Sequence, residues 1–388
     1  MCIRDRICGD LDPTRPYRPA SPHSYTDLGN DQTSGDSHGG CYEKAYEAGI
    51  ALWREKMREF RSVFHSEFGY HGPPRYESLS RFVPPEQIWP IGEAMEYHVQ
   101  DNPYNTIPET FVQVQANMAR ALVGDFEDGA GFVKCASTLH AELLQAEMEH
   151  HRRRKWSNGG AMFWMFNDCW PCASWSAIDY YLVPKPAYYA AKRAAAPIIT
   201  TWIEEEDRYD LHVVNDTLKP LACLLTLGQG RLGGKPRWMR KRRIQVDANT
   251  AKLVATIRKR HLWRQDNSYV FAKLTVGART VATTRFFQNP WREMNWPEPG
   301  LTYRVSKARP VNGTDETGKH REYLMTVSCQ TQNYARMVHL DGIEGPGVYL
   351  SDNFFDLMPH ETRTVEIRSD HPLSPSQIRV RHWLDRWD

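Results

Sequence analysis

The sequence contains no long hydrophobic run and no large excess of charge of either sign. None of its apolar stretches approaches the roughly 18 residues of a membrane-spanning helix, and its first residues do not have the pattern of a signal peptide. The 388 residues carry a formal net charge of +2, which is too small to produce a field that attracts polyanions. We therefore expect neither a nucleic-acid partner nor a membrane.

Cysteine is sparse as well. The eight cysteines lack the density of a disulfide scaffold. Cys169 and Cys172 have the spacing of a redox motif, but no helix pattern starts at the first of them. A zinc site would need a second pair of ligands at suitable spacing, and none is evident. The sequence therefore predicts no metal site and no cofactor.

Aromatic side chains, in contrast, are abundant. Trp, Tyr and Phe make up 12% of the residues, and 13 of them are Trp. The apolar face of a pyranose ring packs on an indole, whereas the sugar hydroxyls need polar neighbours. This composition favours a carbohydrate-binding cleft, although a Trp-rich core would have the same composition.

The first half of the chain alternates helical patterns with short apolar strands. Residues 1–6 resemble translated adapter sequence, and the residues up to about 40 are rich in Pro, Gly, Asp and Ser, which predicts loop. The further expectations are helices over 42–61, 108–123, 131–151 and 185–198 and strands over 62–68 and 159–168. This alternation predicts part of a parallel α/β barrel within residues 1–198.

After residue 199 the pattern becomes that of an all-β protein. Strands of alternating polarity, separated by Gly, Asn and Pro, predict one antiparallel β-sandwich over 199–297 and a second over 298–388. The Pro- and Trp-rich stretch 289–300 is expected to be a linker. The basic run 235–243 is expected to be an exposed loop and strand edge, where positive side chains discourage pairing with other strands.

Polar side chains end the two apolar strands of the first half. Glu67 ends one strand, and Trp164, Asn167 and Asp168 end the other. Active-site groups of a parallel barrel lie at the carboxyl ends of its strands. A retaining glycosidase needs two carboxyl groups about 5–5.5 Å apart, one as nucleophile and one as acid/base. From the residues alone, Glu67 is either such a nucleophile or a residue that caps a helix or pairs with an arginine.

Several motifs resemble those of one enzyme family. The segment "FHSEFGYHGPP", together with "GAMFWMFNDCWPCASWSAIDYYLVPKPAYYAAKR", is similar to the β-mannosidase branch of the family-2 glycoside hydrolases. "DPTRPYRPASP" and "GDSHG" match that family in the same order, and "VYLSDNFFDLMPHETRTVEI" resembles its C-terminal immunoglobulin-like domain. The resemblance covers nearly the whole chain. It implies the C-terminal half of a (β/α)₈ TIM barrel in residues 1–198, followed by two immunoglobulin-like β-sandwiches.

The resemblance also implies a function and roles for individual residues. It implies a retaining exo-β-mannosidase, which hydrolyses terminal non-reducing β-D-mannose residues of an oligosaccharide or glycan through a glycosyl-enzyme intermediate. Glu67 would be the catalytic nucleophile. Trp164 would line the subsite of the terminal mannose, and His38 would lie close to the bound sugar. Asn167 and Asp168 are expected to fix the turn after their strand.

The chain departs from the family pattern at its second carboxylate. The family's acid/base is the Glu of an Asn-Glu dipeptide that precedes the "DPTRPY" segment. Here that segment begins at Asp12, and no Asn-Glu dipeptide occurs in the sequence. We therefore expect a C-terminal fragment that lacks the acid/base and is inactive, or nearly so, on its own. Because an export signal would lie in the missing part, location is open.

A second departure concerns the sugar. His71 and Gly72 stand where many members have Gln-Ser, and the residues after His38 lack the tryptophans that often follow there. Another family-2 glycosidase, such as a β-galactosidase, β-glucuronidase or exo-β-glucosaminidase, is therefore the alternative enzyme. A non-catalytic carbohydrate-binding protein is the alternative from another functional class.

Overall fold

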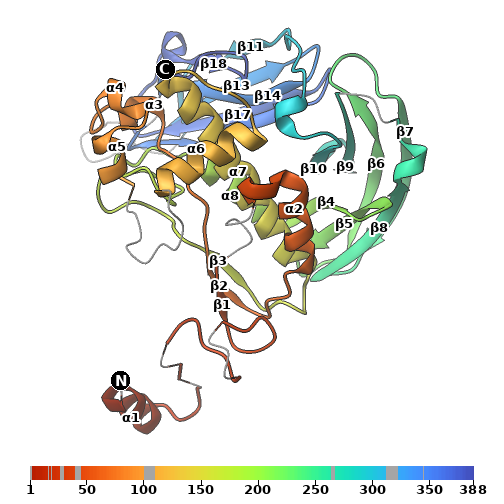
Figure 1. The fold of residues 1–388 in the computed structure, drawn as a ribbon. Coiled ribbons are helices and arrows are strands. Elements are labelled where there is room, and N and C mark those ends of the chain that lie inside the picture. Colours follow the sequence, from red (N-terminus) through yellow and green to blue (C-terminus); the bar gives the residue numbers. More distant parts are fainter. Residues whose placement is uncertain are drawn as a thin grey trace.

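The computed structural model describes residues 2–15, 17–18, 20–26, 30–39, 45–99, 110–263, 267–311, 322–343 and 345–388. Figure 1 shows helices and a short parallel sheet from the first half of the chain, with two antiparallel regions from the second half packed against the helices. In the described part of the chain, no helix is both long and apolar enough to cross a membrane.

A three-stranded parallel sheet lies at one end of the helical region. Its strands, in spatial order, are β1 (Ser37–His38), β2 (His65–Phe68) and β3 (Ala161–Phe163). Both neighbouring pairs run parallel. Because parallel neighbours end at the same edge of a sheet, the residues that follow these strands are brought together.

The helices that lie between these strands in the sequence, and one helix that follows them, pack together with the sheet in the first hydrophobic core (Figure 1). The longer ones are α2 (Ala45–Glu59), α6 (Phe111–Leu122), α7 (Gly129–Arg153) and α8 (Pro186–Ala194). Three short ones are α3 (Tyr76–Leu79), α4 (Pro85–Ile88) and α5 (Glu93–Tyr97). The side chain of Thr110 accepts from the backbone of Gln113 in a capping box, and Asp128 caps α7. Such caps satisfy backbone N–H groups that the helix itself leaves without a partner.

The predicted helices are present, with shifted ends. The helix expected from residue 42 is described from Ala45, and residues 42–44 lie outside the described residues. Pro108, the expected start of the next helix, also lies outside them, and α6 begins at Phe111. Both strands are shorter than expected, since only the residues that find a parallel partner count as strand.

Two expectations were wrong. Residues 2–11, expected to be loop, form the helix α1 (Cys2–Leu11), which lies apart from the rest of the chain in Figure 1. Composition predicted loop from the Pro- and Gly-rich residues that follow, whereas the first ten contain no proline. The expected linker 289–300 is also a packed segment. Trp291 and Met294 are buried in the core of the helical region.

The first antiparallel region has two sheets with a shared core. One sheet has the order β10-β9-β6-β7 and the other the order β4-β5-β8. Its strands are β4 (Ile198–Glu204), β5 (Arg208–Asn215), β6 (Leu221–Arg231), β7 (Trp238–Val246), β8 (Thr250–Arg258), β9 (Ser268–Val276) and β10 (Arg279–Phe287). The basic run 235–243 falls largely on β7, at the edge of its sheet with exposed cationic side chains, which confirms its prediction as a strand edge.

The second antiparallel region has its own core. One sheet has the order β11-β13-β17-β15, with β12 paired to β13, and the other has the order β16-β14-β18. The strands are β11 (Thr302–Val305), β12 (Arg309–Pro310), β13 (Tyr323–Gln330), β14 (Ala335–Asp341), β15 (Val348–Leu350), β16 (Phe355–Leu357), β17 (Thr362–Ser369) and β18 (Arg379–Arg381). The final strands therefore pack as two antiparallel layers, as the alternating polarity predicts.

Candidate active site

The carboxyl ends of the strands β2 and β3 lie close together. Phe68 and Phe163 are register partners, and the backbone N–H of Trp164 donates to the carbonyl oxygen of Phe68 at 2.6 Å. A Cβ atom on Gly69 would lie 2.3 Å from the carbonyl oxygen of Trp164, a distance that no side chain can occupy. Glycine at this position lets the two chains meet, so that Glu67 and Trp164 leave neighbouring strands at the same edge.

Glu67 projects from β2 with 42% of its side chain exposed. His38 is its register partner on β1, and His38 Nδ1 lies 3.9 Å from Glu67 Oε2. The N–H of Gly39 donates to the carbonyl oxygen of Glu67 at 2.8 Å. Among the described residues, this histidine and not an arginine lies within ion-pair distance of Glu67, and Glu67 lies on a strand rather than at a helix start.

A polar network behind Glu67 fixes His38. The hydroxyl of Ser21 lies 2.7 Å from His38 Nε2 and donates to Asp36 at 2.5 Å, and Ser66 donates to the same carboxylate oxygen. Although burial opposes ionisation of Asp36, the hydrogen bonds from Ser21 and Ser66 hold its pKa below the usual value. Asp36 is therefore an ionised structural anchor, with no proton to give to a leaving group.

Trp164 follows β3 with 49% of its surface exposed. Met162 and Phe166, at alternate positions, are also about half exposed. A large apolar side chain that is not packed into a core can stack on a ligand ring. The structure therefore places an available indole at the strand end next to that of Glu67.

Asp168 has a different environment. It is buried, accepts from Ser176 Oγ at 2.6 Å and from Cys172 Sγ at 3.0 Å, and lies 3.8 Å from the ammonium of Lys185. Asn167 donates to the carbonyl oxygen of Asp168 at 3.2 Å. These contacts hold the loop after β3, as the sequence motif suggests. They also account for Cys172, because burial and the charge of Asp168 raise the pKa of its thiol, which opposes redox use.

The residues that depart from the family pattern are packed inside. The ring centroid of His71 lies 4.3 Å from that of Trp175 and 4.5 Å from that of Phe111. Burial, assisted by the positive charge of Lys185, lowers the pKa of His71 to about 3. Gly72 lies against the His140 ring so closely that a Cβ atom would be 2.2 Å from Nδ1. His71 and Gly72 therefore pack in the interior beneath the site.

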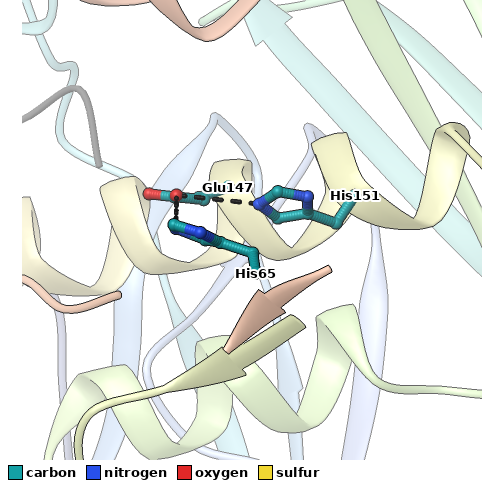
Figure 2. Close-up of side chains that lie close together, drawn as sticks. All are labelled: His65, Glu147 and His151. Carbon is teal, nitrogen blue, oxygen red and sulfur yellow. Dashed lines mark ion pairs between the residues drawn. The ribbon is translucent and has the colours of Figure 1, made fainter. Parts of the chain in front are cut away.

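A second polar cluster was missed by the sequence analysis. His65 on β2 and the pair Glu147 and His151 on α7 are fully buried and point toward one another in Figure 2. Although burial opposes its ionisation, the adjacent His151 and His65 hold the pKa of Glu147 below its usual value. Burial lowers the pKa of His151. The spacing of Glu147 and His151, one helical turn apart, was the available signal; His65 comes from a distant segment.

Comparison with known proteins agrees with this architecture. Residues 207–293 match the model of the mannosidase Ig/CBM-like domain, and residues 296–385 match that of the mannosidase Ig-fold domain. The chain is 25% identical to a β-mannosidase B of Thermothelomyces thermophilus, over 93% of this chain and 43% of that protein. It is 26% identical to a β-mannosidase B of Aspergillus niger, over 92% and 42%. These matches are with the β-mannosidase branch of glycoside hydrolase family 2, which this chain resembles.

Solved structures give the same relationship at the level of the fold. A β-D-mannosidase from Dictyoglomus thermophilum superimposes with a TM-score of 0.81 at 24% identity, over 97% of this chain and 43% of that one. An exo-chitosanase from Amycolatopsis orientalis gives 0.65 at 17% identity, over 83% and 42%. The chain described here therefore spans less than half the length of the relatives that it matches.

Proposed function

We propose that this family-2 chain is the C-terminal part of a retaining exo-β-mannosidase. In this proposal residues 1–198 supply the carboxyl-terminal half of a (β/α)₈ barrel, with β1, β2 and β3 as neighbouring barrel strands. Residues 199–297 and 298–388 form the two immunoglobulin-like domains. The parallel order of the three strands and the helices that cover them support the barrel assignment.

In the proposed reaction, Glu67 attacks the anomeric carbon of a terminal β-D-mannose and forms a glycosyl-enzyme intermediate. The observation that carries this proposal is the position of Glu67: ionisable, partly exposed, and at the strand end next to that of Trp164. Trp164 would stack on the apolar face of the sugar. His38 would hold Glu67 in position and reach the sugar hydroxyls.

The acid/base has no counterpart near Glu67 among the described residues. Asp36, the carboxylate of the adjoining network, is held ionised by its hydrogen bonds. Without a general acid, the leaving group departs as an anion, and no base activates water for the second step. General acid/base help is typically worth about 10²–10⁴-fold. The chain alone should therefore hydrolyse an ordinary aryl β-mannoside barely above background.

The proposed substrate is a β-mannoside oligosaccharide or glycan. The names of the fungal relatives and the Dictyoglomus enzyme favour mannose. The exo-chitosanase shares the fold. Specificity for another sugar within family 2 is therefore the second candidate. A carbohydrate-binding protein without catalysis would retain sugar binding after Glu67→Ala.

The experiment that tests the proposal bypasses the missing acid. With dinitrophenyl β-mannoside, whose leaving group needs no proton, the chain should release about one equivalent of phenol and then stall. Azide, which needs no general base, should restart turnover and give β-mannosyl azide. Glu67→Gln should abolish both phases. An α-configured azide product, an unchanged Glu67→Gln variant or the absence of a burst would overturn the assignment.

A further inference from the structure

The His65, Glu147 and His151 cluster has the make-up of a metal site. Among the described residues, these three side chains form a group of potential metal ligands. Their ligand atoms all lie within 4.8 Å of one another. The side chains of His65 and Glu147 are 0% exposed and that of His151 is 2% exposed. Figure 2 shows the two imidazoles converging on one carboxylate oxygen. His65 Nε2 lies 3.2 Å and His151 Nε2 lies 3.7 Å from Glu147 Oε1.

The contacts of His65 Nδ1 favour one tautomer of its ring. Nδ1 lies 3.1 Å from the carbonyl oxygen of Ser37, which can only accept, and this contact favours the tautomer in which Nδ1 carries the proton. The Ser37 hydroxyl, 3.2 Å from the same nitrogen, has Ser62 Oγ at 2.6 Å as its own partner. In the neutral ring of that tautomer, Nε2 is an acceptor and faces Glu147 Oε1, which is also an acceptor. The two lone pairs repel each other, and a cation bound between the two atoms would remove this repulsion.

A proton alone leaves the cluster unsatisfied. Neither His65 Nε2 nor Glu147 Oε1 has a partner in hydrogen-bond geometry, and both ring nitrogens of His151 are also buried without one. A proton on His65 Nε2 would give that nitrogen a hydrogen bond to Glu147 Oε1. The His151 ring would still face the same oxygen without a partner. A buried polar atom without a partner destabilises the folded chain, because it has lost its hydrogen bonds to water. One metal ion bound by three atoms satisfies His65 Nε2, His151 Nε2 and Glu147 Oε1 together, and leaves only His151 Nδ1 of these buried atoms without a partner.

The spacing and the surroundings fit a zinc-type site. Ligand atoms about 2.0–2.2 Å from a tetrahedral Zn²⁺ lie about 3.3–3.5 Å from one another, which is close to the two observed separations. Ser37 orients His65, and the hydroxyl of Tyr70 donates to Glu147 Oε2. Such outer contacts to a ligating histidine and carboxylate are the usual support of protein metal sites. His151 also lines a surface pocket next to the cluster.

We propose that His65, Glu147 and His151 bind one divalent transition-metal ion, Zn²⁺ by preference, through His65 Nε2, Glu147 Oε1 and His151 Nε2. The ion ties strand β2 to helix α7. Glu67 lies two residues after His65, and Ser37, which holds the His65 ring, precedes His38. The metal therefore fixes both strands that carry the candidate active-site residues. This site does not depend on the proposed mannosidase chemistry, since metal uptake is measured without substrate.

Metal binding by the untagged, EDTA-treated chain tests the proposal. Titration calorimetry with Zn²⁺ and metal analysis after dialysis should give one equivalent bound, and the melting temperature should rise with Zn²⁺. Co²⁺, used as a coloured probe, should give the intense visible bands of a tetrahedral nitrogen and oxygen site. Thiolate charge-transfer absorption would instead assign the ion to cysteines and overturn the proposal, as would the absence of uptake.

Variants assign the ion to these side chains. Glu147→Gln and His151→Asn are close in size to the original residues and should each lose at least tenfold in Zn²⁺ affinity. His150→Gln is the matched control, because His150 is buried next in sequence but bonds to the carbonyl oxygen of Phe60 at 3.0 Å. It should keep the Zn²⁺ affinity of the unmodified chain. Equal binding by all three variants would contradict the site. If the variants fail to fold, the Co²⁺ spectrum of the unmodified chain decides.

Discussion

His38 Nδ1 lies 3.9 Å from Glu67 Oε2, and the two residues are register partners on the parallel strands β1 and β2. The two residues come from separate segments of the chain, and no repeat or periodic pattern in the sequence links them. It is partly exposed, with 25% of the His38 side chain and 42% of the Glu67 side chain accessible. Its position at the strand ends, beside Trp164, makes it the centre of the proposed active site.

Removal of the His38 imidazole should affect reactivity more than stability. His38→Ala should slow covalent labelling of Glu67 by an activated fluorinated β-mannoside about tenfold, because the carboxylate loses the neighbouring ring that holds it in position. Because the pair is partly exposed, the free energy of unfolding should fall by less than about 1 kcal/mol. Adduct formation is followed by intact mass. His261→Ala, at an exposed histidine in the first antiparallel region, is the control. An unchanged labelling rate for His38→Ala would remove His38 from the site.

The contact between β2 and β3 predicts a sensitive glycine. Gly69→Ala places a Cβ atom 2.3 Å from the Trp164 carbonyl oxygen and 2.9 Å from Trp175 Cδ1. Since the first of these is backbone, the strand ends must separate, at a cost of about 1–3 kcal/mol of folding free energy. Gly124→Ala, with no atom within 4 Å of the added carbon, should stay within about 0.5 kcal/mol. Equal urea midpoints for the two variants would contradict the close approach.

Asp168→Asn should destabilise the chain in a pH-dependent way. It leaves the buried ammonium of Lys185 without its carboxylate, which costs about 3–5 kcal/mol. Burial lowers the pKa of Lys185 below its value of 10.5, and Asp168 opposes that shift. Between the folded and unfolded pKa values the unfolded chain binds more protons, so stability rises with pH there. Without Asp168 the folded pKa falls further, and this window widens.

The measurement is the melting temperature of Asp168→Asn and of the unmodified chain from neutral pH to about 10. The deficit of the variant should shrink as the pH rises and Lys185 loses its proton. Asp207→Asn is the control, because Asp207 is 57% exposed in its ion pair with Arg258. Its effect should be small at every pH. A deficit for Asp168→Asn that stays constant with pH would show that Lys185 is not the cause.

The local sequence patterns predicted the helices and strands better than they predicted the contacts between these elements. The helix expected over 131–151 is α7 (Gly129–Arg153), because its apolar spacing is regular and Asp128 caps it. The strand expected over 159–168 is only Ala161–Phe163. Polarity alone could not tell which residues of that run find a parallel neighbour. The Pro-rich composition around residues 12–40 likewise did not predict α1.

The site was partly predictable. Glu67 and Trp164 were candidates because each follows an apolar run, and the structure brings their strand ends together. Ser21 and Asp36 lie in matched motifs of a segment whose composition predicts loop, and neither the motifs nor the composition predicted their bonds to His38 and Ser66. The cluster of His65 with Glu147 and His151 depends on the packing of β2 against α7, which no single stretch of sequence contains.

The measurement that tests the central claim most directly is mass-spectrometric mapping of the chain after reaction with an activated 2-deoxy-2-fluoro-β-mannoside. The fluorine slows release of the sugar and the good leaving group removes the need for an acid, so the adduct should accumulate. The account predicts one equivalent of label on the peptide that contains Glu67, and none in Glu67→Gln. Label on another residue, or no label on the unmodified chain, would contradict it.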